Sequence, residues 1–296
     1  MKRCLALSLC ALFATACGGV LDGVPGEPNR SAQSTKMRSF AWLLQSGSAY
    51  RVTVNPTAGT WMTQRYAIDS RCRRIAPHPR PDRLYCLAYD DNTVLYEVAL
   101  GSGSSTGSTK LNELARLDVY YVGITSACSL NGKVYLASPA SESGVVQLAQ
   151  LTISSGELAP LASYDLASYG VIGGVHGLTM FAGQPTLAIH NGITDQHWVA
   201  HLDQPPVELA FLVEPSGSSK YIYGIASDPT ASSKLLGGIN GSELAVIDAA
   251  SGTTNLLNWT ASGSVGAAPS GQAHDMANAG GCDALPTELP AELPRR

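Results

Sequence analysis

The feature that most constrains this fold is a turn that recurs along the chain at a nearly constant interval. Clusters of glycine, serine and other turn-forming residues are centred near Ala58, Ser104, Ser155, Gln204 and Ser251. The interval between successive clusters is about 48 residues, and a period of about 40–50 residues is typical of chains that repeat one small β-sheet. The chain is therefore expected to consist of copies of one supersecondary unit.

Residues 122–165 are the clearest copy of this unit. Their apolar runs suit four short strands, at residues 123–128, 134–137, 145–153 and 158–164. Asn131-Gly132 tolerates positive φ at both positions and predicts a tight hairpin between the first two strands. Four strands joined by short turns form an antiparallel meander, which is the blade of a β-propeller. We therefore predict an all-β fold, a β-propeller of four-stranded antiparallel sheets over residues 38–283.

The number of blades follows from the copies on either side. Complete blades are expected near residues 70–120, 121–169, 170–219 and 220–260. The region 38–69 offers only three strands, and the missing strand could come from residues 264–268 or 272–277. Closing the first sheet in this way removes an open strand edge. The prediction is five blades, or six if residues 38–69 contain two.

Residues 1–17 have the features of an export signal peptide. Lys2 and Arg3 give a positive start, and residues 5–16 are apolar but too short to span a bilayer. The sequence from Ala14 to Cys17 resembles the lipobox of bacterial lipoproteins, although alanine stands at position 14 where leucine is commoner. The resemblance implies a lipidated Cys17 and, because Gly18 rather than aspartate follows, transfer to the outer membrane. The alternative is an ordinary secretory signal in which Cys17 is incidental.

The segments that flank the predicted propeller contain no apolar period. Residues 18–37 are rich in glycine, proline and polar residues, which predicts a flexible tether. Residues 284–296 repeat a Leu-Pro unit, and proline at this density predicts an extended tail. The formal net charge of −4 provides no basic surface, so nucleic acid is not an expected partner.

Four cysteines remain once those of residues 1–17 are set aside: Cys72, Cys86, Cys128 and Cys282. An even number in an exported chain favours disulfides. Cys72 and Cys86 flank a proline-rich turn centred near Pro79, so they are expected to face each other across two antiparallel strands. By elimination, Cys128 would pair with Cys282. The chain contains no C-x-x-C spacing, so disulfides are favoured over a metal site for these cysteines.

Several polar residues lie on or just after the strands expected to line the centre of the propeller: His78, His176, Asp228 and His274. They could gather around a metal ion or a polar substrate, or they could be wet polar positions with no common role. His197 and His201 have the spacing of a helical metal pair, but Trp198-Val199-Ala200 between them favours a strand. Catalytic residues cannot be assigned from this pattern, and no G-x-S-x-G motif is present.

The pattern strand, NG turn, strand, strand, SG turn in residues 122–165 and 225–253 is similar to that of bacterial propellers of the YVTN and lactonase types. This resemblance covers most of the mature chain loosely. It implies a group that includes both surface-binding proteins and enzymes such as lactonases and lyases, so it does not decide whether the chain is an enzyme.

We therefore expect a monomeric, lipid-anchored binding or scaffold protein of the cell envelope, without a cofactor, whose partner is an envelope protein or a glycan. It would face the periplasm or the cell surface. The alternative is a metal-assisted hydrolase or lyase in which calcium or another divalent metal is held by the four channel residues. A third interpretation is an assembly lipoprotein that docks a partner through residues 285–296.

Overall fold

The computed structural model of this 296-residue chain describes residues 38–45, 47–55, 59–80, 82–89, 92–100, 110–126, 132–202, 204–210, 221–228, 233–239, 243–259 and 275–278. They belong to one compact unit that spans residues 37–296. Within the described ranges there is no helix with the length and apolar character needed to cross a membrane. The predicted lipobox with Cys17, the tether, His274 and the proline-rich tail lie outside these ranges.

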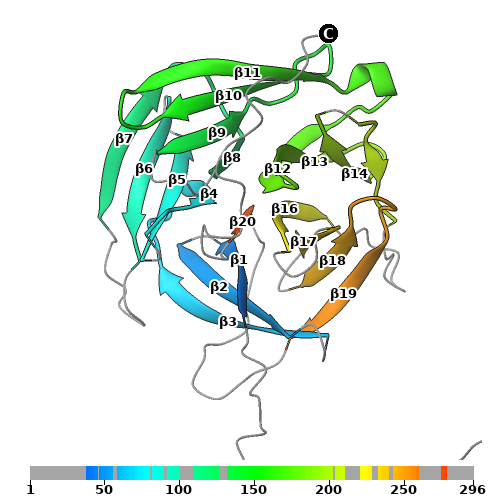
Figure 1. Ribbon diagram of the computed structural model, residues 1–296, viewed down its shortest axis with the longest axis horizontal. Helices are drawn as coiled ribbons and strands as arrows, with labels where there is room; N and C mark the ends of the chain where they lie inside the picture. Colours follow the sequence, from blue (N-terminus) through cyan, green and yellow to red (C-terminus); the bar gives the residue numbers. More distant parts are fainter. Residues whose placement is uncertain are drawn as a thin grey trace, which may run out of the picture. The chain divides into compact units, whose positions relative to one another are not determined.

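The described strands form five four-stranded antiparallel blades (Figure 1). Blade 1 consists of β20 (Asp275–Asn278), β1 (Arg38–Gln45), β2 (Ser48–Asn55) and β3 (Thr60–Ala67). Blade 2 consists of β4 (Cys72–Pro77), β5 (Arg83–Tyr89), β6 (Thr93–Ala99) and β7 (Leu111–Leu117). Blade 3 consists of β8 (Gly123–Ser126), β9 (Lys133–Ala137), β10 (Val145–Thr152) and β11 (Glu157–Asp165). A short 3-10 helix, Ala167–Tyr169, follows blade 3.

Blade 4 consists of β12 (Gly174–Phe181), β13 (Gln184–Asn191), β14 (Gln196–His201) and β15 (Val207–Glu208). Blade 5 consists of β16 (Ile222–Ser227), β17 (Lys234–Ile239), β18 (Leu244–Asp248) and β19 (Thr254–Trp259). The outer strands β19 and β3 also pair in parallel, so blades 5 and 1 form one continuous sheet. The predicted fold class is confirmed, and each recurring turn falls between the third and fourth strands of a blade.

Blade 1 is closed by the far end of the chain, as the count of strands in residues 38–69 predicted. β20 pairs antiparallel with β1, from Leu44 opposite Asp275 to Ala41 opposite Asn278. The strand therefore comes from the second of the two candidate segments. This pairing covers the edge of β1 that would otherwise present unpaired backbone groups.

The innermost strands β4, β8, β12, β16 and β20 follow one another around a common centre (Figure 1). Neighbouring innermost strands run in the same direction. Near their starts, the Arg74 Nε donates a hydrogen bond to the Val122 carbonyl at 2.6 Å, and at their ends the Ser126 hydroxyl donates to the Pro77 carbonyl at 2.6 Å. We call the end at which these strands begin the N-face and the end at which they finish the C-face.

Matching positions of the innermost strands carry Arg74, Gly123, Gly177, Gly224 and Asp275. A β-bulge comes directly before Arg74, Gly177 and Gly224. At Gly224 an added Cβ would lie 2.2 Å from the backbone nitrogen of Met276, so only glycine permits this approach of β16 to β20. The three glycines thus allow the innermost strands to lie close together. The other two matching positions carry the charged residues Arg74 and Asp275.

Asp275 holds the closing strand against blade 2. Its Oδ2 accepts a hydrogen bond from the Ile75 backbone N–H at 2.8 Å, and its side chain is buried. Burial raises the pKa of this carboxyl from 3.8 to about 7, and the Arg74 guanidinium opposes the increase. The ring is therefore closed by a carboxyl group that is costly to ionise.

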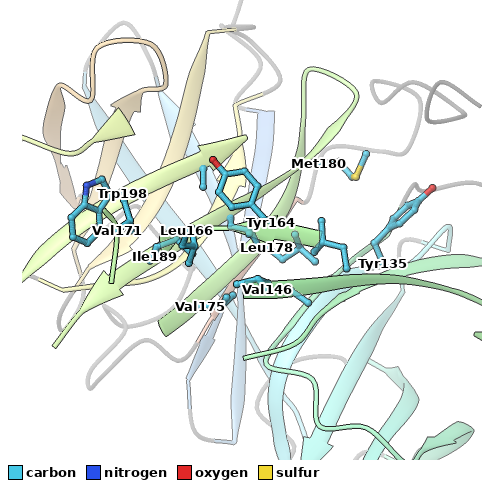
Figure 2. Packing of buried hydrophobic residues seen from close by; sticks show 14 residues of the cluster. Tyr135, Val146, Tyr164, Leu166, Val171, Val175, Leu178, Met180, Ile189 and Trp198 are labelled. Carbon is cyan, nitrogen blue, oxygen red and sulfur yellow. The ribbon is translucent and has the colours of Figure 1, made fainter. Parts of the chain in front are cut away.

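Five hydrophobic clusters lie between successive blades and complete the ring. Successive side chains of a strand point to opposite faces of the sheet, so one strand can contribute to two clusters. In β1, Trp42 and Leu44 face blade 2, whereas Ala41 and Leu43 face blade 5. Figure 2 shows the cluster between blades 3 and 4, where Tyr164 and Val146 lie beside Leu178 and Val175. The core is thus distributed between the blades rather than concentrated in one layer.

The predicted disulfide between Cys72 and Cys86 is confirmed, with a Cα–Cα distance of 5.5 Å. The two cysteines do not face each other directly across a turn centred near Pro79, as the sequence predicted. Pro77 lies opposite Leu84, so the turn is centred near residue 80 rather than at Pro79. The bulge before Arg74 brings Cys72 within reach of Cys86 although the two are not directly opposite. Cys128 and Cys282 lie outside the described residues, and their pairing stays a prediction.

Candidate functional site: the N-face

The structure places the predicted channel residues at two different ends of the ring. His176 lies near the start of β12 and therefore at the N-face. His78 and Asp228 come directly after β4 and β16, so they lie at the C-face. An innermost strand of six residues is about 20 Å long, which separates the two ends. The described members of the predicted set are therefore not brought together.

His78 turns away from the centre toward the outer strands of blade 2. Its Nε2 lies 3.2 Å from the Glu97 Oε1, its Nδ1 accepts a hydrogen bond from the Arg80 backbone N–H, and its ring contacts Tyr85 at 4.6 Å between centroids. Burial lowers the pKa of His78, and the Glu97 carboxylate opposes this effect. Within the described parts of the chain, no group of three or more His, Cys, Asp or Glu side chains is arranged to hold a metal ion.

His197 and His201 are on β14, as the strand interpretation of their spacing predicted. His201 pairs with the Thr186 hydroxyl at 2.9 Å and packs on Phe181 at 5.4 Å between ring centroids. His197 lies opposite His190 on the neighbouring strand, at the other end of β14. The two histidines therefore have separate environments.

A group of aromatic and imidazole rings gathers at the N-face between blades 4 and 5, and we call it the ring cluster: His176, His190, His197, Tyr221 and Tyr223. His176 and Tyr223 occupy the bulge positions of β12 and β16, which displace these two residues from the regular pairing. His190 and His197 form a cross-strand pair whose rings stack at 4.3 Å with an angle of 20° between their planes.

Four members of the ring cluster contact one another in a closed circuit. His190 meets Tyr221 at 4.8 Å and 88°, and it meets His176 at 5.0 Å and 89°. Tyr223 completes the circuit, at 6.3 Å from Tyr221 and 6.4 Å from His176 between ring centroids. His176, Tyr221 and Tyr223 are half-buried, so part of the circuit is open to solvent.

Asp195 adds a carboxylate to the ring cluster from the turn between β13 and β14. Its side chain is 41% exposed, accepts a hydrogen bond from the Tyr221 hydroxyl at 3.0 Å and lies 3.7 Å from the His190 Nε2. Asp195 has a φ of 54°, in the left-handed region that non-glycine residues rarely adopt. The turn thus holds a partly exposed carboxylate beside the rings.

The imidazoles of the ring cluster are neutral near pH 7. Burial, together with the neighbouring His190, lowers the pKa of His176 to about 4 and that of His197 to about 3. Burial also lowers the pKa of His190, and the Asp195 carboxylate opposes that effect. The charge at the ring cluster is therefore that of Asp195.

The N-face also carries most of the exposed apolar side chains. Connections between the second and third strands of a blade, and from each fourth strand to the next blade, lie at this face because strand direction alternates. Among the described residues, seven large apolar side chains are exposed, and five of them are in such connections: Val119, Tyr120, Tyr169, Ile172 and Ile193. The fractions reach 70% for Ile172 and 91% for Ile193. Large exposed apolar patches mark interaction sites, and these five side chains are the apolar surface that the described N-face offers.

The described N-face connections are more acidic than basic. Asp118, Glu142 and Asp165 are exposed there. The guanidinium of Arg71 is paired with Asp69 at 3.0 Å. Near the C-face the two signs are mixed: Lys133 and Lys234 begin β9 and β17, and Asp82 and Asp228 lie in connections at that end. The two ends of the ring thus differ in charge.

Both ends of the described unit lie at the C-face. β20 finishes there with Asn278, and β1, which is antiparallel to β20, begins there with Arg38. The first and last described residues therefore lie at the end of the ring opposite the ring cluster.

Sequence reasoning named His176 but missed His190, Asp195, Tyr221 and Tyr223 as its neighbours. The useful signal is a Tyr-x-Tyr pair at the start of an innermost strand, together with His190 and His197, which the strand register places opposite each other. The bulges that bring these residues together have no evident signature in the sequence.

Comparisons with known proteins agree with this architecture. No family model matches the chain, and no curated protein matches it. A chain in the crystal structure of a nidogen/laminin complex is similar, with a TM-score of 0.50 and 12% identity over 82% of this chain and 99% of that chain. Sqt1 of Saccharomyces cerevisiae has a TM-score of 0.37 and 13% identity over 73% of this chain and 59% of its own.

A protein from Lactobacillus plantarum has a TM-score of 0.34 and 14% identity, over 75% of this chain and 67% of its own. Likeness at such low identity bears on the fold alone. Together with the strand pairing, the likeness to the chain of the nidogen/laminin complex shows a β-propeller fold, and the described residues form five blades of it.

Proposed function

We propose that this chain is a lipid-anchored binding protein of the cell envelope that holds an envelope protein or glycan on its N-face. The observation that carries the proposal is the collection of exposed apolar side chains at that face, on the end of the ring opposite both ends of the described unit. When a partner covers apolar surface of this kind, binding is stabilised by about 25 cal/mol per Å² of apolar area removed from water.

The location of the chain ends supports the proposed orientation. Cys17 is the expected lipid anchor, and residues 18–37 are the expected tether. A flexible linker of this length has a root-mean-square span of about 25 Å. Because Arg38 enters at the C-face, an anchored molecule directs that face toward the bilayer and offers the N-face to other envelope components. The less acidic C-face suits this position beside anionic lipid headgroups.

The site favours binding over metal-assisted hydrolysis. Hydrolysis of that type requires several ligands that converge on one ion. The described members of the proposed ligand set, His78, His176 and Asp228, lie at two ends of the ring. In the ring cluster, the stacking of His190 and His197 keeps their nitrogen lone pairs in nearly parallel planes, which does not favour convergence on one ion.

The test is site-specific photo-cross-linking in intact cells. A photo-reactive residue at position 193, which is 91% exposed on the N-face, should form a cross-link to a defined envelope component. The matched control is position 256, where Leu256 is 36% exposed on the outer strand β19. Ile172→Asp should abolish the cross-link at position 193. Equal cross-linking from positions 193 and 256, or a cross-link that survives Ile172→Asp, would contradict the proposal.

The anchor requires a separate test. Cys17→Ser should release the chain from the membrane fraction into the soluble envelope fraction while its fold stays intact. Continued membrane association of this variant would contradict lipidation of Cys17 without affecting the assignment of the N-face.

A further inference from the structure

We propose that the four-ring circuit of His176, His190, Tyr221 and Tyr223, together with Asp195, binds an organic cation, and that this cation is a lysine or arginine side chain of the partner protein. This inference rests on the proposed function because it assumes that a partner covers the N-face. It goes further by naming the chemistry that the partner presents.

The spacing of the four rings suits a bound cation. The circuit has sides of 4.8, 6.3, 6.4 and 5.0 Å between ring centroids. A cation seated about 4 Å above the middle of such a circuit lies roughly 5–6 Å from each centroid, within the distance of about 6 Å at which a cation is attracted to a ring face. His190 stands nearly perpendicular to both of its neighbours, so the four rings do not lie flat on one another.

The charges around the circuit also favour a cation. Neutral imidazoles do not repel a cation, and the low pKa values of His176 and His197 keep them neutral at physiological pH. Asp195 supplies the opposite charge at one corner of the circuit, where the Tyr221 hydroxyl fixes its carboxylate. Three other exposed acidic residues add negative charge to the N-face: Asp118, Glu142 and Asp165. Such a field favours approach of a basic partner.

A third observation is the state of His190. The residue is 7% exposed, and its buried Nε2 has no hydrogen-bond partner among the described residues. The nearest carboxylate oxygen to this Nε2 that the structure shows is the Asp195 Oδ1 at 3.7 Å, beyond hydrogen-bond distance. The imidazole edge of His190 thus lies beside the Asp195 carboxylate without a hydrogen bond to it. A cation bound at Asp195 would therefore not have to displace a hydrogen bond between Asp195 and His190.

The alternative source of an organic cation is a lipid headgroup. The ring cluster is at the N-face, whereas the chain joins the described unit from the C-face. Under the proposed orientation the anchoring membrane is on the other side of the ring, which favours a protein side chain.

The test uses the full-length protein in maltoside micelles and observes the Tyr and His ring resonances by NMR. The probes are n-butylammonium and n-butylguanidinium, which match lysine and arginine, with choline for the lipid headgroup and butan-1-ol as the neutral control. We expect the two butyl cations to bind with dissociation constants on the order of a few millimolar and butan-1-ol to have no effect.

Asp195→Asn should weaken binding of the butyl cations about tenfold, and Tyr223→Leu should weaken it several-fold. Asp82→Asn, which removes an exposed carboxylate beside the C-face turn, is the matched control and should have no effect. Circular dichroism and thermal unfolding of each variant separate loss of the site from loss of the fold.

Three results would overturn the inference: no binding of either butyl cation, equal binding of butan-1-ol, or undiminished binding to Asp195→Asn. Tighter binding of choline than of both butyl cations would overturn the assignment to lysine or arginine and indicate a quaternary headgroup. If the cross-link at position 193 forms but the cations do not bind, only this inference fails. If the cations bind and no partner is cross-linked, the proposed function fails instead.

Discussion

Replacing Asp275 with asparagine tests how the ring is closed. The side chain is buried between the innermost strands, and burial raises its pKa from 3.8 to about 7. Asparagine has the same shape, and its side-chain oxygen can still accept the hydrogen bond from the Ile75 backbone N–H. The substitution therefore removes the ionisation of this group while it preserves the contact that holds β20 against β4.

The sign of the expected effect follows from the raised pKa. Between pH 4 and pH 7 the folded state retains a proton on Asp275 that the unfolded state has lost, so the free energy of unfolding falls as the pH rises. The contribution is fully present below pH 3.8 and is lost as the pH passes about 7. The difference between the two pKa values corresponds to about 4 kcal/mol as an upper limit.

The assay is urea unfolding of the wild type and Asp275→Asn at several pH values from 4.5 to 8. Near pH 4.5 the two should have similar free energies of unfolding, and by pH 8 the variant should be more stable by up to about 4 kcal/mol. Comparing the two proteins at each pH cancels the slope from the histidines, which both contain. Asp118→Asn, which removes an exposed charge, is the control. A difference that stays constant over this range would refute the reasoning and show that Arg74 keeps Asp275 ionised.

Three further outcomes are expected. Gly224→Ala should lower the free energy of unfolding by at least about 2 kcal/mol, because the added Cβ would meet the backbone of β20. In the same assay, Gly174→Ala should change it by no more than about 0.5 kcal/mol, because its Cβ would approach no atom nearer than 3.9 Å. Loss of the bond between Cys72 and Cys86, which are 14 residues apart, in a double alanine variant should cost about 3 kcal/mol, and equal stability under reducing and oxidising conditions would contradict this. In NMR titrations the His197 ring should remain neutral down to about pH 4, and a midpoint near 6.5 would show that it is not buried as described.

Much of the fold could be predicted because turn chemistry is local. Each third-to-fourth-strand turn is marked by small and polar residues, so their regular spacing revealed the blades before any contact was known. The shortage of strands in residues 38–69 predicted the closing strand for the same reason. The disulfide was predictable because Cys72 and Cys86 belong to one hairpin.

The ring cluster could not be predicted because its members meet across blades. His176 and Tyr223 are brought together only by the angle between blades 4 and 5 and by the bulges in β12 and β16. Asp195 depends on a turn with positive φ, and its neighbour Tyr221 precedes the next blade. Neither the contact between His176 and Tyr223 nor that between Asp195 and Tyr221 follows from spacing in the sequence. The sequence analysis therefore grouped His176 with His78 and Asp228, which lie at the other end of the ring.

The blade shared between the two ends of the chain sets the order in which the molecule can be completed. β1 is synthesised first, but its partner β20 follows about 230 residues later. At about 5–20 residues per second, a ribosome needs roughly 10 to 50 s to supply it. During that interval the edge of β1 is open, and the ring cannot close until residues 275–278 have been made. A chain truncated before Asp275 would lack the strand that completes blade 1, so the first blade to be started is the last to be finished.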